Sequence, residues 1–482
     1  MRKSVYLVIA VICLLVILVP VFTACSSRPV NAPVIGSKND RLVVYNWEDY
    51  IDYSNLDSFK SYYKSKTGRE LDITYTTFDT NETMLTKVLK NDANVDLICP
   101  SEYAVEKLMR AEKLYSFQEV TQSIQSDLDK YNIELNNLGN VQPGIKKAID
   151  VSFSKIPVGN TTQNMNDYIL PYMWGTLGIM YNVKYVTEED LAEGWGLAWN
   201  KANNPLLENM ILVKDSVRDV YAAGILYMKQ YGLLPPEYQN RSNVELINCT
   251  DDILIKMVEE VLTDQRKHIS GYEVDFGKDD MLNEIAYVDL SWSGDAMWAI
   301  SESFDENLGI YTLDYFVPEI GGNIWYDGWV VPKTAKNKLA AMMFIDYMAI
   351  PEHAILNSEE IGYTSAVDKA LMQADSKVLD ILTENGYEDT AEYFADERRY
   401  PLIEDPEVFA SLGVMQDYGS RNEIVVQMWE RVKAGGSISL DLVWITLGIV
   451  GAGVLVACLY FAKEGLKRRP KIVKDKTNVQ NA

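Results

Sequence analysis

The stretch LVVYNWEDY at residues 42–50 opens an alternation of strand and helix patterns that decides the fold class. Its apolar beginning predicts a short strand, and an amphipathic helical pattern with an expected end at Gly68 follows it. The same change from apolar run to helical pattern occurs twice more. The predicted strands are 42–45, 71–75 and 95–99, and the predicted helices are 55–66, 81–90 and 101–110. This β-α-β-α-β-α order predicts an α/β lobe with a parallel sheet and helices on both faces.

The alternation resumes later in the chain and predicts a second α/β lobe. Strands are expected at 210–213 and 286–290, each followed by a helix. A further strand is expected up to residue 331, followed by a helix at 337–348. Since roughly 400 residues exceed what one hydrophobic core serves, two lobes are expected.

Three tryptophans are near an acid in the sequence: Trp47-Glu48-Asp49, Trp292 with Asp295, and Trp325 with Asp327. On an extended strand, residues two positions apart point to the same face, which would apply to the first and third of these groups. An indole face beside a carboxylate suits an organic ammonium, because the ring attracts the cation and the carboxylate accepts its N–H groups. If the fold brings these groups together, the chain has a cleft for an amine.

The positions of the polar motifs support a binding site. In open α/β sheets, ligands bind beyond the carboxyl ends of the strands. Several motif residues directly follow predicted strands, namely Trp47, Ser101 to Tyr103, Ser216 to Asp219, and Trp292. We therefore expect them to face a common cleft.

Charge and cysteine usage narrow the function class. The chain has 45 basic and 69 acidic residues, a net charge of −24, which argues against nucleic acid as a partner and favours small cations. Cys99 is expected to be a buried free thiol, and the sequence has no disulfide framework and no metal-type Cys/His cluster. We expect surface roles for the two histidines, His268 and His353.

Each end of the chain has a long apolar segment. Residues 1–25 read as an export signal whose Thr23-Ala24-Cys25 resembles a bacterial lipobox, so Cys25 is the expected lipidation site, with an uncleaved anchor as the alternative. Residues 26–40 are expected to be a tether. The uncharged segment 442–462 predicts a transmembrane helix, and the basic tail 463–482 places the C-terminus in the cytoplasm. The binding domain is then expected on the extracellular or periplasmic face of the cell membrane.

A set of motifs, in order between residues 41 and 435, resembles the spermidine/putrescine-binding proteins of polyamine ABC transporters. They are VYNWEDY (44–50), TFDTNETM (77–84), DLICPS (96–101), PYMWGT (171–176), IWYD (324–327) and IGY (361–363). The resemblance implies a type II periplasmic-binding-protein fold with two α/β lobes, crossing hinge strands and a ligand clamped between the lobes. The expected segments are lobe 1 at 41–172 and 326–385, lobe 2 at 173–325, and C-terminal helices of lobe 2 and the hinge at 386–436.

The resemblance also implies site residues. Aromatic contacts are expected from Trp47, Tyr50, Tyr103, Trp292, Trp325 and Tyr363, and polar ones from Glu48, Ser101, Asp219, Asp327 and, on a loose alignment, Gln416. Asp219 and the central Asp327 would bind ammonium groups. Ser216 stands where spermidine binders often have a second Asp, which weakens a spermidine-only interpretation, although Glu48 or Asp215 could compensate.

The functional prediction is a monomeric, membrane-anchored receptor that passes putrescine or spermidine to an ABC permease, with no catalysis and no cofactor.

Simpler interpretations exist for several residues: Asp219 as a capping-box acid, Ser101 as an N-cap, Trp325 as core and Asp49 as a solvated residue. The alternatives for the whole protein are a receptor of the same fold for an amino acid, a sugar or iron, and a surface glycoside hydrolase that uses an acid pair.

Overall fold

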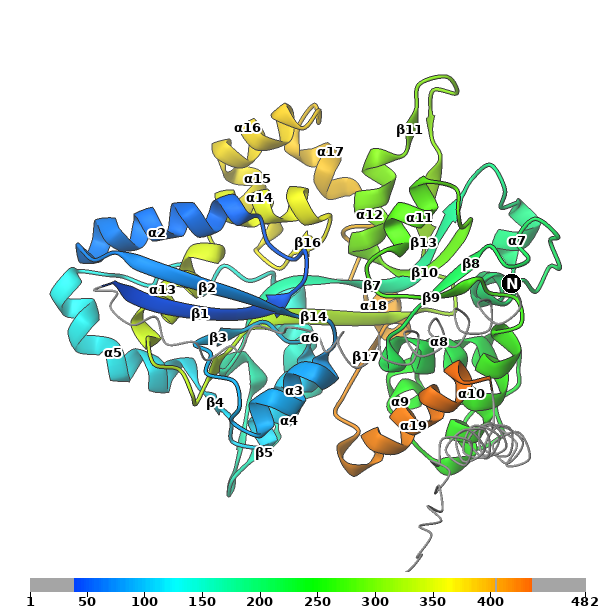
Figure 1. The fold of residues 1–482 in the computed structure, drawn as a ribbon, viewed down its shortest axis with the longest axis horizontal. Coiled ribbons are helices and arrows are strands. Elements are labelled where there is room, and N and C mark those ends of the chain that lie inside the picture. The colour runs from blue at the N-terminus through cyan, green and yellow to red at the C-terminus, as the bar shows by residue number, and fades with distance from the viewer. Residues whose placement is uncertain (1–38, 404, 436–482) are drawn as a thin grey trace, which may run out of the picture.

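Two β-sheets organise the residues that the computed structural model describes, 39–403 and 405–435. The smaller sheet has the strand order β2-β1-β3, and the larger one has the order β17-β14-β7-β10-β8-β9. They belong to two α/β lobes, the first at the left and the second at the right of Figure 1. The predictions for the signal segment with Cys25, for nearly all of the tether, for the apolar segment 442–462 and for the basic tail lie outside the described residues.

The first lobe has the predicted parallel sheet. Strand β1 pairs in parallel with β2 on one side and with β3 on the other. Helix α2 ends where Gly68 takes φ 71°, a left-handed conformation that glycine adopts without steric cost. The elements are β1 (Asp40–Trp47), α2 (Tyr53–Thr67), β2 (Leu71–Phe78), α3 (Asn81–Leu89), β3 (Leu97–Ile98), α4 (Glu102–Arg110), β4 (Leu114–Tyr115), α5 (Phe117–Tyr131), α6 (Pro143–Phe153), β5 (Ile156–Val158) and β6 (Thr161–Gln163).

The sheet of the second lobe is mixed. Strand β8 runs parallel to β10 and β9, whereas β10 and β13 run antiparallel to β7. The elements are β7 (Leu170–Asn182), α7 (Glu188–Ala192), β8 (Ile211–Lys214), α8 (Val217–Gln230), α9 (Asn243–Ile247), α10 (Asp252–Gln265), β9 (Gly271–Glu273), α11 (Gly277–Leu282), β10 (Val288–Trp292), α12 (Ser293–Glu302), β11 (Phe304–Asp305), β12 (Ile310–Tyr311) and β13 (Leu313–Phe316). The predicted strands at 210–213 and 286–290 thus correspond to β8 and β10, each shifted by one or two residues.

Two long strands carry the chain through the middle of the molecule. Strand β7 pairs antiparallel with β14 at its first half and with β10 and β13 at its second half (Figure 1). The predicted lobe boundaries at 172/173 and 325/326 therefore fall inside continuous strands. The remaining elements are β14 (Asn323–Trp329), β15 (Val331–Pro332), α13 (Lys338–Met348), α14 (Pro351–Ile361), β16 (Thr364–Ser365), α15 (Lys369–Ala374), α16 (Ser376–Glu384), α17 (Thr390–Ala395), α18 (Pro406–Ser411), β17 (Gly413–Val414) and α19 (Asn422–Lys433).

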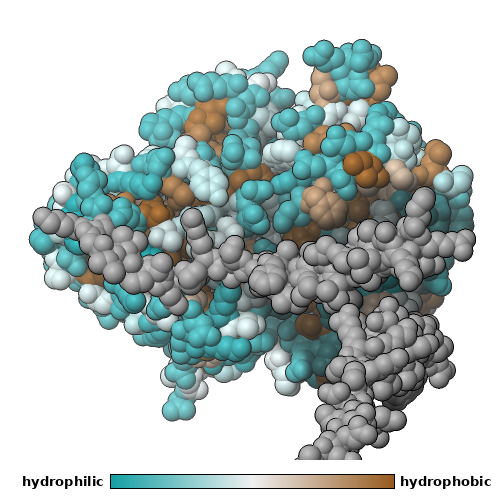
Figure 2. Space-filling model, viewed as in Figure 1, coloured by the Kyte–Doolittle hydropathy of each residue, from teal (hydrophilic) through white to brown (hydrophobic). Residues whose placement is uncertain are grey.

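The last segments of the chain return to both lobes. Helix α13 packs on α5, α2 and β1 of the first lobe, and α19 packs on α10 and α8 of the second. Within the described residues, no single helix is long and apolar enough to cross a membrane, although α13 and α14, bent by 77°, pass together by length and composition. On the face drawn in Figure 2, hydrophilic residues predominate and hydrophobic ones gather in small separate areas.

Candidate functional site

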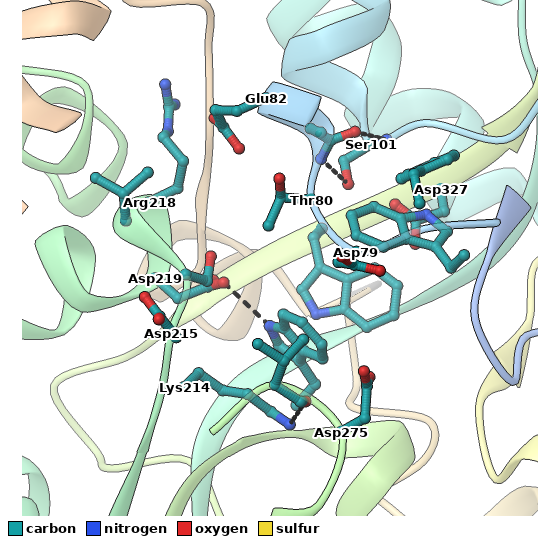
Figure 3. A pocket seen from close by; sticks show the side chains of 18 of the residues that line it. Asp79, Thr80, Glu82, Ser101, Lys214, Asp215, Arg218, Asp219, Asp275 and Asp327 are labelled. Carbon is teal, nitrogen blue, oxygen red and sulfur yellow. Dashed lines mark hydrogen bonds between the residues drawn. The ribbon is translucent and has the colours of Figure 1, made fainter. Parts of the chain in front are cut away.

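A pocket lies between the two lobes, with an empty volume of about 1370 Å³ counted out to its open mouth. Its walls come from the ends of β1, β8 and β10, the first turns of α4, α8 and α12, and the middle of β14. Figure 3 shows Ser101 and Asp327 on one side of it and Asp219 and Lys214 on the other. Acidic side chains outnumber basic ones among the lining residues, which favours a cationic ligand.

The structure brings together nearly all of the predicted binding residues. Those that line the pocket are Trp47, Glu48, Tyr50, Ser101, Tyr103, Asp219, Trp292, Trp325, Asp327 and Tyr363. Gln416 is not among the lining residues, and its neighbour Met415 is. The backbone of Gln416 is engaged, since its N–H donates to Asn248 and its carbonyl oxygen accepts from Arg218.

Asp327 is the central carboxylate of the pocket. It lies on β14 on the same face as Trp325, as the two-residue spacing predicts. The Tyr50 hydroxyl donates to its Oδ2 at 2.9 Å, and its Oδ1 has no partner among the described residues. Burial raises its pKa from 3.8 to about 7, against the hydrogen bonds from Ser101 and Tyr50. The carboxyl group thus has a free acceptor in a place where a cation would ionise it.

Aromatic rings surround this carboxylate. The Tyr363 ring lies edge-on to Trp325 and Tyr50, with centroid distances of 5.6 and 4.9 Å. Glycines make room for them: a Cβ on Gly175 would lie 2.7 Å from the Trp325 ring, and one on Gly294 would overlap the Tyr363 ring. The close approach of backbone to ring fixes the walls of the pocket on this side.

Asp219 forms the second acidic point of the pocket. Its Oδ2 accepts the indole N–H of Trp292 at 3.1 Å, which ties the first turn of α8 to the end of β10. Burial raises the pKa of Asp219, opposed by hydrogen bonds from Ser216 and Trp292. Ser216 is the N-cap of α8 but makes no side-chain cap bond, so the reciprocal capping box is not formed here.

The first Trp–acid group differs from the expectation. Trp47 ends β1 and packs on Phe78 with a centroid distance of 4.6 Å, but the strand stops there. Asp49 sits in a turn with φ 46° and is exposed, as is Glu48. The prediction that Trp47 and Asp49 share a strand face is therefore wrong, because two-residue periodicity holds only while the backbone stays extended.

Ser101 and Tyr103 are positioned by one amide. Ser101 is the N-cap of α4 but makes no side-chain cap bond. The Asn81 Nδ2 instead donates to the Ser101 Oγ at 2.9 Å and to the Tyr103 hydroxyl at 3.0 Å. The first turn of α4 is thereby bound to the first residue of α3, and both Ser101 and Tyr103 line the pocket.

Two buried charged residues of the pocket were not predicted. The Arg218 guanidinium lies between the rings of Tyr103 and Tyr418, at 4.4 and 3.4 Å from their centroids, and its Nε and Nη1 have no partner among the described residues. Burial raises the pKa of Glu102 to about 8. Arg218 is next to the predicted Asp219 in the sequence, and Glu102 is next to the predicted Ser101. Their positions in the first turns of α8 and α4 could therefore have indicated them.

The roles of Lys214 at the end of β8 and of Glu273 were also not predicted. Lys214 is buried and contacts Asp295 and Glu273, and all three line the pocket. The neighbouring Asp215 accepts the Trp429 indole N–H at 2.7 Å and pairs with Lys433 at 3.1 Å. Because its carboxylate is already paired, Asp215 is a poor substitute for the acid that is absent at Ser216.

The described residues contain no group of three or more His, Cys, Asp or Glu side chains that could hold a metal ion. His268 lies at the surface, 3.1 Å from Glu208, and His353 stacks on Tyr347 at 3.9 Å. Burial lowers the pKa of His353 to about 4, so it is neutral at pH 7. Cys99 is a buried free thiol, as predicted.

Comparison with known proteins gives consistent matches over most of the chain. Residues 45–355 match the family model of bacterial extracellular solute-binding proteins. A spermidine/putrescine-binding periplasmic protein of Salmonella typhimurium is 25% identical over 401 residues, 83% of this chain and 93% of that protein. A putrescine-binding periplasmic protein of Pseudomonas aeruginosa is 25% identical over 319 residues, 65% and 75% of the two chains. The solved spermidine/putrescine ABC transporter substrate-binding protein of Streptococcus pneumoniae superposes with a TM-score of 0.55 at 26% identity, covering 82% and 99%.

Proposed function

Because the chain belongs to the family of bacterial extracellular solute-binding proteins, we propose that it captures a polyamine, putrescine or spermidine, between its two lobes. Members of this family are solute receptors and not enzymes, which removes the glycoside hydrolase alternative. Relatives described as binding spermidine and putrescine, or putrescine, support this choice of ligand.

The observation that carries the proposal is the surroundings of Asp327. A buried carboxylate with one free oxygen, walled by Trp325, Tyr50 and Tyr363, is a site for an ammonium group on an apolar chain. Charged hydrogen bonds contribute roughly 1.5–3 kcal/mol each, and a desolvated cation–π contact contributes about 2 kcal/mol. After the ordering costs, we expect micromolar affinity or better, about −8 kcal/mol.

A second ammonium would bind at Asp219. Trp292, whose indole N–H holds that carboxylate, and Trp47 on the opposite wall offer ring faces to the methylene groups between the two cations. The separation of Asp219 and Asp327 would then set the length of the ligand.

Titration calorimetry of the full chain in detergent tests this proposal. We expect binding of putrescine or spermidine with a Kd of about 1 μM or less, and no heat with sugars. The absence of heat with putrescine, spermidine and spermine would contradict it.

One observation favours a second candidate ligand, an amino acid. The buried Arg218 has two nitrogens without partners among the described residues, and a ligand carboxylate could accept from them. A panel of acidic, neutral and basic amino acids in the same calorimetric experiment separates the two candidates.

We further propose that the receptor works as a monomer that delivers its ligand to an ABC permease in the membrane. The lobes would be 41–172 with 326–385, and 173–325 with 386–436, closing about the strands that connect them. The sequence supports two anchors, lipidated Cys25 and the segment 442–462, which would hold the receptor beside its permease at high effective concentration.

Fractionation of cells tests the two anchors. We expect Cys25→Ala alone, and deletion of 436–482 alone, to leave the protein with the membrane. The combined variant should remain unprocessed at its signal segment or leave the membrane. Release by either single change would show that the other segment is not an anchor.

A further inference from the structure

The pocket contains an ammonium group that belongs to the protein itself. The Nζ of Lys214 lies 4.6 Å from the centroid of the Trp292 ring, 2.7 Å from Asp295 Oδ2 and 2.6 Å from Glu273 Oε1. It also donates to the carbonyl oxygen of Val274 at 2.6 Å. An indole face, two carboxylates and a carbonyl are the groups that a bound amine requires.

The groups around this ammonium are fixed by further contacts. The Tyr363 hydroxyl donates to Asp295 Oδ1 at 2.8 Å, and the Gly277 N–H donates to Glu273 Oε2 at 2.9 Å. Lys214 itself is 1% exposed at the end of β8 (Figure 3). It donates hydrogen bonds to Asp295 and to the Val274 carbonyl and forms an ion pair with Glu273, so it occupies the position that a ligand ammonium would take against these groups.

Among the acids that line the pocket, Asp327 and Asp219 lie buried on the two sides of it without an ion pair. Asp327 has a free Oδ1, and Asp219 is held only by neutral donors, Trp292 and Ser216. We propose that Lys214 is a resident ammonium that fills one cation position of the pocket and makes the site select a diamine over a triamine. The inference rests on the proposed function and deepens it, because it names the preferred class of polyamine.

Prior occupancy gives the selection its physical cause. A third ammonium that reaches from Asp219 toward the end of β8 would meet a Trp292 ring face already covered by the Lys214 ammonium, and carboxylates of Asp295 and Glu273 already paired with it. It would also lie beside a fixed cation, which repels it more strongly in a partly desolvated pocket than in bulk water. Ser216 also disfavours a triamine, because its neutral side chain offers no negative charge to a third ammonium. Specificity of this kind rests on a repulsive element as well as on attractive ones.

The alternative is that Lys214 only stabilises the fold as a buried ion pair. Replacing it would then lower stability and change putrescine and spermidine affinity by the same factor. The ratio of the two affinities therefore separates selection from stabilisation, since loss of folded protein cancels in a ratio.

The experiment measures both affinities by calorimetry in the full chain, in Lys214→Met and in Lys214→Arg. We expect the unaltered protein to prefer putrescine, Lys214→Met to shift the ratio toward spermidine by about 10-fold, and Lys214→Arg to keep the original preference because it keeps the charge. Lys229→Met makes the same substitution on α8 outside the pocket and should not change the ratio.

The outcomes distinguish this inference from the proposed function. Absence of binding of any polyamine to the unaltered protein would overturn both. A preference for spermidine in the unaltered protein, or an unchanged ratio in Lys214→Met, would overturn the inference and leave the polyamine receptor standing. If Lys214→Met does not fold, the double variant Lys214→Met/Glu273→Gln replaces it. The double variant removes one charge of each sign and still leaves Asp295 to bind an ammonium. An unchanged affinity ratio in the double variant would likewise overturn the inference.

Discussion

Asp327 is the main proposed ligand-binding residue of the pocket. Its carboxylate is buried, is held by Tyr50 and has one oxygen free. We expect Asp327→Asn to weaken polyamine binding about 100-fold or more, because one to two charged hydrogen bonds of roughly 1.5–3 kcal/mol are lost. Calorimetry measures the effect. Asp346→Asn, a buried acid outside the pocket, is the matched control and should retain the affinity.

The raised pKa of Asp327 makes binding depend on pH. An ammonium ligand requires the ionised carboxylate, so affinity should rise with pH up to about 7, the pKa of the free protein, and then level off. Calorimetry between about pH 5 and pH 8 tests this dependence. In Asp327→Asn the residual affinity should vary less with pH, and an equally steep dependence would contradict the assignment to Asp327.

The same group affects the stability of the free protein in the opposite direction. Between its ordinary pKa of 3.8 and about 7, Asp327 holds a proton in the folded state that the unfolded state has lost, so stability falls as pH rises through this window. Glu102, with a pKa raised to about 8, adds to the trend. Thermal unfolding without ligand should therefore give a shallower pH dependence in Asp327→Asn than in the original protein. An equal slope in both would contradict this account.

At the scale of residues, the sequence predicts what local spacing determines. Trp325 and Asp327 face one way because the strand is extended, and the acid at position 219 lies in the first turn of a helix as expected. Lys214 and Arg218 were not predicted. Their roles depend on groups from distant elements, Glu273, Asp295 and Tyr418, which only the tertiary fold brings near them.

At the scale of elements, β7 and β14 join the lobes, and β14 carries Trp325 and Asp327 into the pocket. Gly175 of β7 is paired with Trp325 of β14, and a Cβ there would come within 2.7 Å of the Trp325 ring and still closer to the Ser293 Oγ. We expect Gly175→Ala to displace the ring and weaken polyamine binding about 10-fold. Gly139→Ala, at a glycine with open space around its Cα, is the control for calorimetry and should leave affinity unchanged. Unchanged binding in Gly175→Ala would show that the ring tolerates the shift.

The strands of the first lobe could be predicted and β7 could not, for a physical reason. The first three strands are short apolar runs separated by helical patterns, and their order specifies a parallel sheet. The segment LPYMWGTLGIMYN of β7 is buried on both faces at nearly every position, so it shows no alternation. A strand covered by both lobes carries no periodic signal of its direction or length.

At the scale of the whole molecule, the net charge of −24 produces a field that attracts polyamine cations. We expect the association rate measured by stopped flow to fall several-fold between about 0.01 and 0.15 M NaCl, as the Debye length shortens from roughly 30 to 8 Å. Sucrose of equal osmolarity is the control and should not reproduce the decrease. A rate independent of salt would mean that encounter is not steered by charge.

The indoles of the pocket have an optical consequence. Trp47, Trp292 and Trp325 line the pocket, and Trp47 and Trp325 have ring nitrogens without a hydrogen-bond partner among the described residues. An arriving cation would change the electric field at these chromophores and expel the water beside them, both of which alter the emission of tryptophan. The receptor would therefore report its own occupancy as a change in intrinsic fluorescence, which makes it usable as a label-free amine sensor in solution.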